Sequence, residues 1–343
     1  MIFDWLLNKH IFLLDWIQVE ISSYCNALCI YCPHSAYKKN WQNRYLPLEL
    51  FKKLVPAFKS TRLIYLQGWG EPFTHPQFFE MLRIAKEAGC QVGTTTNGTL
   101  LSKELIERLV CEGLDIIGFS LAGTDEKNDS IRKGTKIRKV LESTEFIHQA
   151  KNKYGVDNPK LHIAYMLLRS GLDDLDDLPN FLAHTGAAQT VMSSLSFIVN
   201  PQLESESVLA ANKSEYLDLK HRLLAVKKTS LDLGTELHCQ IVSPLKNSFS
   251  CSENCDRAVV IGSDGGVSPC VMTQIPVKRQ NGYYFMGKKQ NLQTLCFGNI
   301  GQDSLSTIRH RPEYKNFVRH FKKGDPPAVC QRCLKRYMSN LRE

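Results

Sequence analysis

Three cysteines, Cys25, Cys29 and Cys32, stand close together near the start of this 343-residue chain in a C-x3-C-x2-C spacing. They directly follow residues 17–22, whose alternating apolar and polar side chains predict a β-strand. Thiolates at such short intervals are ligands for zinc or for an iron–sulfur cluster. Three thiolates are one ligand short of a tetrahedral zinc site, which His34 could complete. On a four-iron cluster they would leave one iron without a protein ligand. Both possibilities stand at this point.

Polar side chains follow three further predicted strands. Gly70 and Glu71 lie in a Gly-Trp-Gly-Glu-Pro turn after the second strand, Asn97 follows the third, and Ser120 lies at the end of the fourth. Glycines let a ligand approach the backbone closely, and a carboxylate accepts hydrogen bonds from an ammonium group. Asn97 and Ser120 carry neutral groups of the kind that bind a ribose or a carboxylate, although each could instead cap the helix after it.

Five cysteines in the C-terminal part of the chain are candidate ligands for a second site. Residues 258–272 predict a β-hairpin with an Asp-Gly turn, which brings Cys255 and Cys270 to adjacent strand ends. A predicted helix over residues 304–323 returns the chain to them. Four thiolates bind zinc tetrahedrally or hold an iron–sulfur cluster. The five candidate ligands are Cys251, Cys255, Cys270, Cys330 and Cys333.

The segments between these motifs predict alternating strands and helices. We expect strands over residues 17–22, 62–68, 91–96, 116–122, 161–168 and 191–199, and helices over 46–60, 76–89, 102–113, 138–154, 176–184 and 214–233. Six such units with right-handed crossovers predict an α/β fold, a partial (β/α)6 TIM-like barrel. In this architecture function sits at the C-terminal ends of the strands, where the polar motifs fall.

The length of the chain favours a large domain followed by a smaller one. We expect an N-terminal extension over residues 1–16, the barrel over 17–234, and a small α+β domain over 235–343 that holds the second cysteine set. Short β segments replace the strand–helix alternation beyond residue 235.

Composition and charge narrow the protein class. Twelve cysteines in a chain this long indicate metal sites or reduced thiols rather than a disulfide framework. We expect no signal peptide and no membrane span, which makes the cytoplasm the expected compartment. The net charge is +9, and residues 309–343 hold ten Lys and Arg against three Asp and Glu. This basic tail is either a solvated helix face or a contact for an acidic peptide, a phosphorylated substrate or nucleic acid.

Taken together, the ordered motifs over about residues 15–200 resemble the radical S-adenosylmethionine (SAM) superfamily. Tyr31 supplies the aromatic residue before the last cysteine, and Ala122 stands where an Asp is frequent. The Gly68–Pro72 turn is similar to that family's Gly-Gly-Glu-Pro motif, with Trp69 between two glycines. The segments that carry the resemblance are the cysteine loop, this turn, Thr96-Asn97-Gly98 and Ser120.

The resemblance implies that the three cysteines hold a [4Fe-4S] cluster whose open iron chelates SAM. Reductive cleavage of SAM would give a 5′-deoxyadenosyl radical that takes a hydrogen atom from a substrate. His34 then becomes a bystander. The implied SAM contacts are Gly70 and Glu71 to the amino group, Ser120 and Arg132 to the carboxylate, Asn97 to the ribose and Tyr31 near the adenine.

The second cysteine set resembles the SPASM/twitch extension that binds auxiliary clusters. The hairpin residues 265–270 and the segment 297–300 carry this likeness. No cysteine follows Cys333, which implies one auxiliary [4Fe-4S] cluster. The implied ligands are Cys255, Cys270, Cys330 and Cys333, with Cys251 as the alternative to one of them.

Three functions stay open from the sequence. The first is maturase-type modification of a peptide or protein, because many similar proteins with such extensions act on peptides. The second is oxidation or rearrangement of a small molecule such as a sugar, aminocyclitol or cofactor precursor. The third, from another class, is a non-catalytic zinc or iron–sulfur module that binds nucleic acid. For the enzyme we expect a reductant such as flavodoxin or ferredoxin as a partner, and neither membrane nor nucleic acid.

Overall fold

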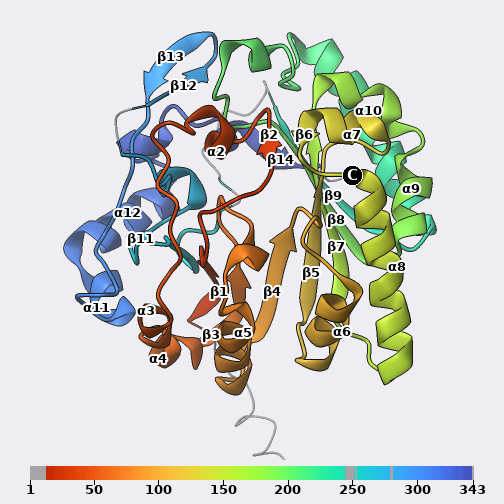
Figure 1. Ribbon diagram of the computed structural model, residues 1–343. Helices are drawn as coiled ribbons and strands as arrows, with labels where there is room; N and C mark the ends of the chain where they lie inside the picture. The colour runs from red at the N-terminus through yellow and green to blue at the C-terminus, as the bar shows by residue number, and fades with distance from the viewer. Residues whose placement is uncertain (1–12, 244–250, 252, 279–280, 342–343) are drawn as a thin grey trace, which may run out of the picture.

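The computed structural model describes residues 13–243, 251, 253–278 and 281–341 (Figure 1). Its centre is one ten-stranded sheet with the strand order β11-β10-β1-β3-β4-β5-β7-β8-β9-β14. The eight strands from β10 to β9 run parallel, and β11 and β14 pair antiparallel at the two edges. The strands are β1 Leu14–Val19, β3 Thr61–Leu66, β4 Gln91–Thr96, β5 Ile116–Leu121, β7 Lys160–Leu167, β8 Gln189–Ser194, β9 Glu236–Val242, β10 Ala258–Ile261, β11 Val267–Ser268 and β14 Met338–Asn340.

Helices cover the convex face of this sheet, as Figure 1 shows. They pack there because every second strand residue is apolar and fully buried, for example Ile17 and Val19 in β1 and Ile64 and Leu66 in β3. Ser102 caps α6 by accepting a hydrogen bond from the backbone N–H of Leu105 at 3.2 Å. The helices between the strands are α5 Phe78–Glu87, α6 Lys103–Cys111, α7 Glu126–Ile131, α8 Ile137–Tyr154, α9 Leu178–Thr185 and α10 Lys213–Asp232.

The fold class is confirmed, and all six predicted strands are present. Two further parallel strands extend the sheet beyond them: β9 follows β8, and β10 pairs with β1 with Val19 opposite Ile261. Strands on both sides of residue 235 therefore belong to one sheet. The domain boundary near residue 235 stays a prediction.

Two predicted helices are each broken in two by a proline. The helix expected over residues 46–60 is α3 Leu48–Lys52 followed by α4 Val55–Phe58, which has Pro56 in its first turn. The helix expected over 304–323 is α11 Leu305–His310 followed by α12 Pro312–Lys323. Proline lacks the N–H that a continuous helix needs at this point. Before Pro312 the backbone of Arg311 is also extended, with ψ at 145°.

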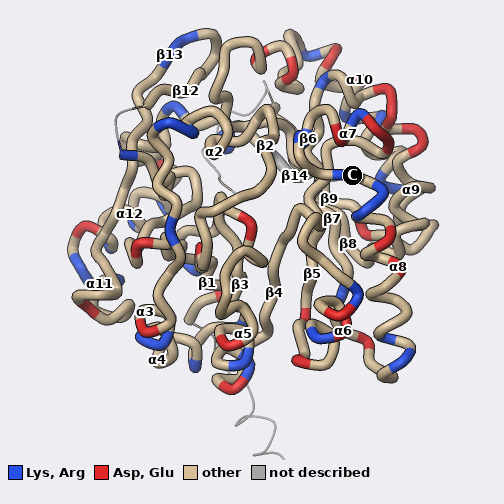
Figure 2. Tube along the Cα trace, in the orientation of Figure 1, with Lys and Arg blue, Asp and Glu red and all other residues tan. Residues whose placement is uncertain are grey.

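The C-terminal part adds a small antiparallel hairpin of β12 Gly282–Phe285 and β13 Lys288–Asn291, which stands apart from the main sheet (Figure 1). Short elements near the cysteines complete the fold: β2 Leu28–Cys29, α2 Pro33–Ala36 and β6 Arg132–Lys133. Charges of both signs lie along the helices and loops around the sheet (Figure 2). Across the described ranges, none of the helices has the length and apolar character needed to cross a membrane.

Glu20 is a buried acid at the end of β1, with an exposed fraction of only 2%. Burial raises the pKa of its carboxyl from 4.5 to about 7. Between these two pH values the folded protein holds a proton that the unfolded chain has lost, so stability falls as the pH rises. Relative to Glu20→Gln, we expect the free energy of unfolding of the wild type to fall by about 3 kcal/mol between about pH 4.5 and 7. Urea unfolding of both proteins across this range measures it, and a constant difference would contradict the expectation.

Candidate active site

The three N-terminal cysteines line one cavity of about 340 Å³ at the C-terminal ends of the parallel strands. Cys29 lies in β2, which pairs with β6, and Cys32 lies directly before α2. Burial, together with the neighbouring thiols, raises the pKa of Cys25 to about 11 and that of Cys32 to about 12. Such thiols stay protonated unless a cation faces them, so the donor set fits an iron–sulfur cluster, which supplies that positive charge.

The predicted SAM contacts line the same cavity. They come from several different strand ends and loops, as expected for a barrel whose site lies at the C-terminal ends of its strands. The residues brought together with the cysteines are Tyr31, Gly70, Glu71, Asn97, Ser120 and Arg132. The assignment of an individual SAM group to each of them stays a prediction.

Glu71 is almost fully buried and held by donors from the next strand. Thr96 Oγ1 donates to its Oε1 at 2.6 Å, and the backbone N–H of Asn97 donates to its Oε2 at 2.8 Å. Burial raises the pKa of Glu71 to about 7. A Cβ on Gly70 would lie 2.3 Å from the carbonyl oxygen of Ser22, so only glycine lets this turn pack against the cysteine loop.

Arg132 is the buried cation of the cavity. It lies opposite Cys29 in the β2–β6 pair, and its Nη1 donates a hydrogen bond to the hydroxyl of Tyr31. Its Nε has no hydrogen-bond partner among the residues that the structure describes. A buried guanidinium with a spare donor beside the cluster cysteines fits the binding of a carboxylate.

Asn97 is bound to the loop of Cys25 through its side chain. Its Nδ2 donates to Asn26 Oδ1 at 2.9 Å, and its Oδ1 accepts from the hydroxyl of Thr99 at 2.6 Å. His34 does not line the cavity and packs edge-on against Trp41, with ring centroids 5.1 Å apart. The Cys3His zinc arrangement is therefore not built here.

Lys335 also lines this cavity, although sequence reasoning placed it in a basic tail. Its Nζ forms an ion pair with Glu253 Oε1, and both side chains are 17% exposed. The only signal in the sequence that links Lys335 to a cofactor site is its position two residues after Cys333. Further cavity residues that sequence reasoning did not assign to it are Trp69, Ser193, Ser194, Ser196 and Met272.

Three cysteines of the second set line a smaller cavity of about 50 Å³: Cys270, Cys330 and Cys333. Cys255 lies close enough to Cys270 and Cys251 for their charges to add to burial in raising its pKa. Burial raises the pKa of both Cys270 and Cys333 to about 11. These thiols therefore also fit a cluster that stabilises their thiolate form.

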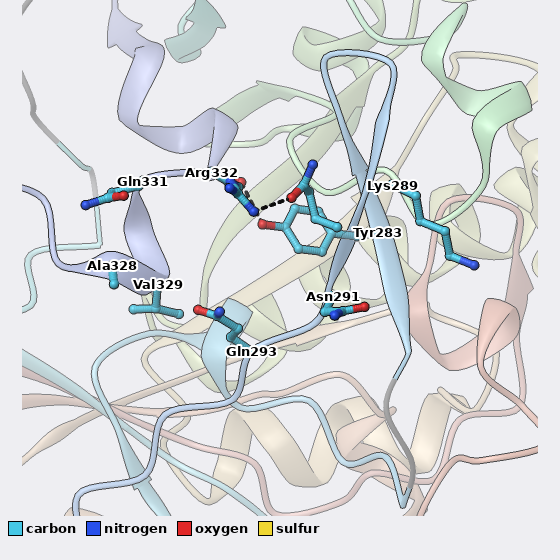
Figure 3. Close-up of a pocket in the computed structure, with 9 residues that line it drawn as sticks. Tyr283, Lys289, Asn291, Gln293, Ala328, Val329, Gln331 and Arg332 are labelled. Atoms are coloured by element: carbon cyan, nitrogen blue, oxygen red, sulfur yellow. Dashed lines mark hydrogen bonds between the residues drawn. The ribbon is translucent and has the colours of Figure 1, made fainter.

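The two cavities adjoin, because both are lined by Ser196 and Met272. On its outer side the auxiliary cavity shares Tyr283 and Arg332 with a surface groove of about 500 Å³, shown in Figure 3. The three spaces thus form a series from the N-terminal cysteines, past the auxiliary cysteines, to the surface.

Two family models match the chain in the order that these sites suggest. The radical SAM superfamily model matches residues 19–181, and the SPASM model, an iron–sulfur cluster-binding domain, matches residues 251–334. The tungsten-containing aldehyde ferredoxin oxidoreductase cofactor-modifying protein of Pyrococcus furiosus is 25% identical over 315 residues, 89% of this chain and 83% of that protein.

Solved structures share the fold at low identity. Streptococcus suis SuiB bound to S-adenosylmethionine has a TM-score of 0.66 and 16% identity, covering 97% of this chain and 74% of SuiB. SuiB has also been solved with its precursor peptide SuiA. The structure of anSMEcpe with S-adenosylmethionine and the Cp18Cys peptide has a TM-score of 0.60 and 18% identity. The match covers 95% of this chain and 88% of anSMEcpe.

The fold and the two cysteine sites thus define an enzyme that uses iron–sulfur clusters. The chain is a radical SAM enzyme with a C-terminal SPASM domain, and its cofactors are [4Fe-4S] clusters and SAM.

Proposed function

We propose that the protein abstracts a hydrogen atom from a peptide or protein substrate in a maturase-type modification. The observation that carries the reaction type is the single cavity that holds three cysteines with Glu71, Ser120 and Arg132. When bound there, the cluster and SAM supply a 5′-deoxyadenosyl radical, as the superfamily implies. Cleavage consumes an electron, so a low-potential donor such as flavodoxin or ferredoxin is the proposed redox partner.

In this proposal the residues of the chain bind and orient SAM. Cys25, Cys29 and Cys32 hold the cluster. The Glu71 carboxylate accepts hydrogen bonds from the ammonium group of SAM, because it is the acidic side chain among the cavity residues. Arg132 takes the carboxylate with Ser120, and its spare Nε supports this role. The remaining proposed contacts are Asn97 to the ribose and Tyr31 near the adenine.

The auxiliary site holds one [4Fe-4S] cluster in this proposal. Its ligands are Cys255, Cys270, Cys330 and Cys333, and Cys251 is the alternative to one of them. The location of three of these thiols around a single small cavity supports one cluster rather than two.

A peptide substrate is supported by the surface groove beside the auxiliary cysteines (Figure 3). Four amide side chains line it, together with Arg332 and Lys289, and none of its nine lining residues is acidic. Amides both donate and accept hydrogen bonds, as the backbone of an extended peptide requires. That SuiB and anSMEcpe have been solved with peptides agrees with this substrate class.

The edge of β13 offers backbone groups for such a peptide. Leu292 N–H donates to Asn281 O, and the register pairs Asn291 with Gly282 and Lys289 with Tyr284. In this antiparallel pattern the N–H and C=O groups of Lys289 and Asn291 point away from β12. Over the described part of the chain they have no backbone partner, so an extended peptide could add to this edge as a third strand.

Asn291→Pro tests this edge, because it removes one outward N–H without removing a hydrogen bond between β12 and β13. We expect the KM for a peptide substrate to rise about fivefold, the effect of one lost hydrogen bond of about 1 kcal/mol. Asn291→Ala loses the same side-chain amide but keeps the N–H, so it is the matched control, and the fivefold rise is measured relative to it. Equal KM values for Asn291→Pro and Asn291→Ala would remove the backbone edge from substrate binding.

Modification of a small molecule is the second candidate. It is favoured by the Pyrococcus furiosus relative, whose name describes a cofactor-modifying protein and which this chain matches over most of its length. In both candidates the cavity chemistry is the same, and only the molecule that enters the cavity differs.

One fractionation experiment separates the two substrate classes. The anaerobically reconstituted enzyme is supplied with SAM and dithionite, and 5′-deoxyadenosine formation is measured with the peptide fraction and the small-molecule fraction of a cell extract. We expect stimulation by the peptide fraction, and its loss after the fraction is digested to free amino acids. Stimulation by the small-molecule fraction alone would support the second candidate instead.

A further inference from the structure

Trp69 connects the proposed SAM-binding turn to the hairpin that carries Cys270. Its indole Nε1 donates hydrogen bonds to the carbonyl oxygens of Gln274 at 2.9 Å and Val271 at 3.1 Å. Val271 begins the short 3-10 turn that directly follows Cys270. Two residues after Trp69 in the chain lies Glu71, whose carboxylate we assign to the amino group of SAM. One side chain thus spans from the SAM-binding turn to the segment that leaves an auxiliary cysteine.

The backbone of Trp69 is attached to the other side of the same hairpin through Glu20. The N–H of Trp69 donates to Glu20 Oε1 at 2.8 Å, and Ser263 Oγ donates to Glu20 Oε2 at 2.9 Å. Ser263 lies two residues after β10 ends, before the hairpin turns. A Cβ on Gly68 would lie 2.2 Å from Glu20 Cγ, so glycine is needed where the turn crosses this side chain. We call Glu20, Trp69 and their partners Ser263, Val271 and Gln274 the Glu20–Trp69 clamp.

Aromatic packing extends the clamp to the auxiliary cavity. Trp69 lies 6.4 Å from Phe197, and Phe197 stacks on Tyr283 with ring centroids 5.2 Å apart. Phe197 and Tyr283 line the auxiliary cavity, whereas Trp69 lines the active-site cavity. The turn that precedes Glu71 therefore contacts both the segment after Cys270 and an aromatic residue of the auxiliary cavity.

We propose that the Glu20–Trp69 clamp couples the two cofactor sites, so that occupation of the auxiliary site strengthens SAM binding. A bound auxiliary cluster ties Cys270 to Cys330 and Cys333 and so holds the hairpin in place. The clamp then holds Gly70 and Glu71 where they bind SAM, which makes Trp69 a positioning residue. This inference rests on the proposed role of Glu71. Because coupling between two binding sites is reciprocal, bound SAM also strengthens the binding of auxiliary iron at equilibrium.

The test measures the Kd of SAM by equilibrium dialysis on anaerobically reconstituted, oxidised protein, in which no turnover occurs. We expect Cys330→Ala with Cys333→Ala to raise the Kd about tenfold, a typical size for coupled sites. Trp69→Phe keeps an aromatic ring of smaller size and loses the indole N–H, and should raise the Kd by a similar factor. Adding the two cysteine changes to Trp69→Phe should raise it no further.

Trp41→Phe is the matched control, because the indole N–H of Trp41 donates to Ser23 O at 2.9 Å and does not reach the hairpin. Its effect on the Kd should add to that of the cysteine changes. If the cysteine variant does not fold, Ser263→Ala and Trp69→Phe with both clusters present replace it. Each should raise the Kd and lower the amount of auxiliary iron retained at equilibrium with a chelator.

Two results would overturn the coupling: a Kd unaffected by loss of the auxiliary cluster, or an equal effect of that loss in the wild type and in Trp69→Phe. An unchanged Kd in Ser263→Ala and Trp69→Phe with both clusters present would also overturn the coupling. A wild type that binds no SAM at all would instead refute the proposed function, so the two failures are distinguishable.

Discussion

Replacing Cys25, Cys29 and Cys32 together by alanine should abolish 5′-deoxyadenosine formation and leave about half of the bound iron. The three thiols line the active-site cavity, whereas the auxiliary thiols belong to a separate cavity behind Ser196 and Met272. The variant therefore loses one cluster and keeps the other. Iron analysis and 5′-deoxyadenosine assays after anaerobic reconstitution measure both quantities.

The chain offers a matched control in three cysteines outside both sets. Cys90 and Cys239 are buried, and Cys111 is exposed at the end of α6. Replacing Cys90, Cys111 and Cys239 by alanine removes the same number of thiols and should leave iron content and activity unchanged. Loss of all iron in the Cys25, Cys29 and Cys32 variant would contradict an independent auxiliary site.

Glu71→Ala should weaken SAM binding about 100-fold, equivalent to about 2.7 kcal/mol. The change removes the acceptor for the SAM ammonium group, and it leaves Thr96 Oγ1 and the N–H of Asn97 as buried donors that must find new partners. Equilibrium dialysis measures the effect. Glu71→Gln keeps the shape and one acceptor oxygen, so it isolates the contribution of the negative charge.

The pH dependence follows from the burial of Glu71, which raises its pKa to about 7. Below this pH the carboxyl gains a proton and loses the charge that attracts an ammonium group. We therefore expect SAM affinity to fall as the pH drops below about 7 in the wild type and to change little in Glu71→Gln. A Glu71→Gln protein that binds SAM like the wild type at pH 8 would exclude the charge from recognition.

Local sequence patterns were sufficient for the central strands and for the residues at their ends. Alternating apolar residues and a terminal Gly, Asn or Ser are local signals, and the cavity brings Glu71, Asn97 and Ser120 together as predicted. The pairing of β10 with β1 was not predictable in this way. It joins residues about 240 positions apart, and no local periodicity encodes which strand becomes the neighbour of another.

Three residues show why part of the site and of the fold escaped prediction. Glu20 occupies a polar position of an alternating strand and would ordinarily face water, but the hairpin covers it. Lys335 belongs to a basic segment whose charge suggested solvent, and only the fold places it beside Glu253. In the fold, Pro312 carries a local signal of its own, because proline interrupts a helix, and the single helix expected over residues 304–323 was wrong for this reason.

The central claim is that Cys25, Cys29 and Cys32 hold a cluster with an open iron that binds SAM. The most direct test is electron paramagnetic resonance of the dithionite-reduced protein in which Cys330 and Cys333 are alanine, so that only this cluster contributes. We expect a reduced [4Fe-4S] signal that changes shape when SAM is added and is absent when Cys25, Cys29 and Cys32 are also replaced. A signal that SAM leaves unchanged, at concentrations far above the Kd found for this variant, would contradict the account.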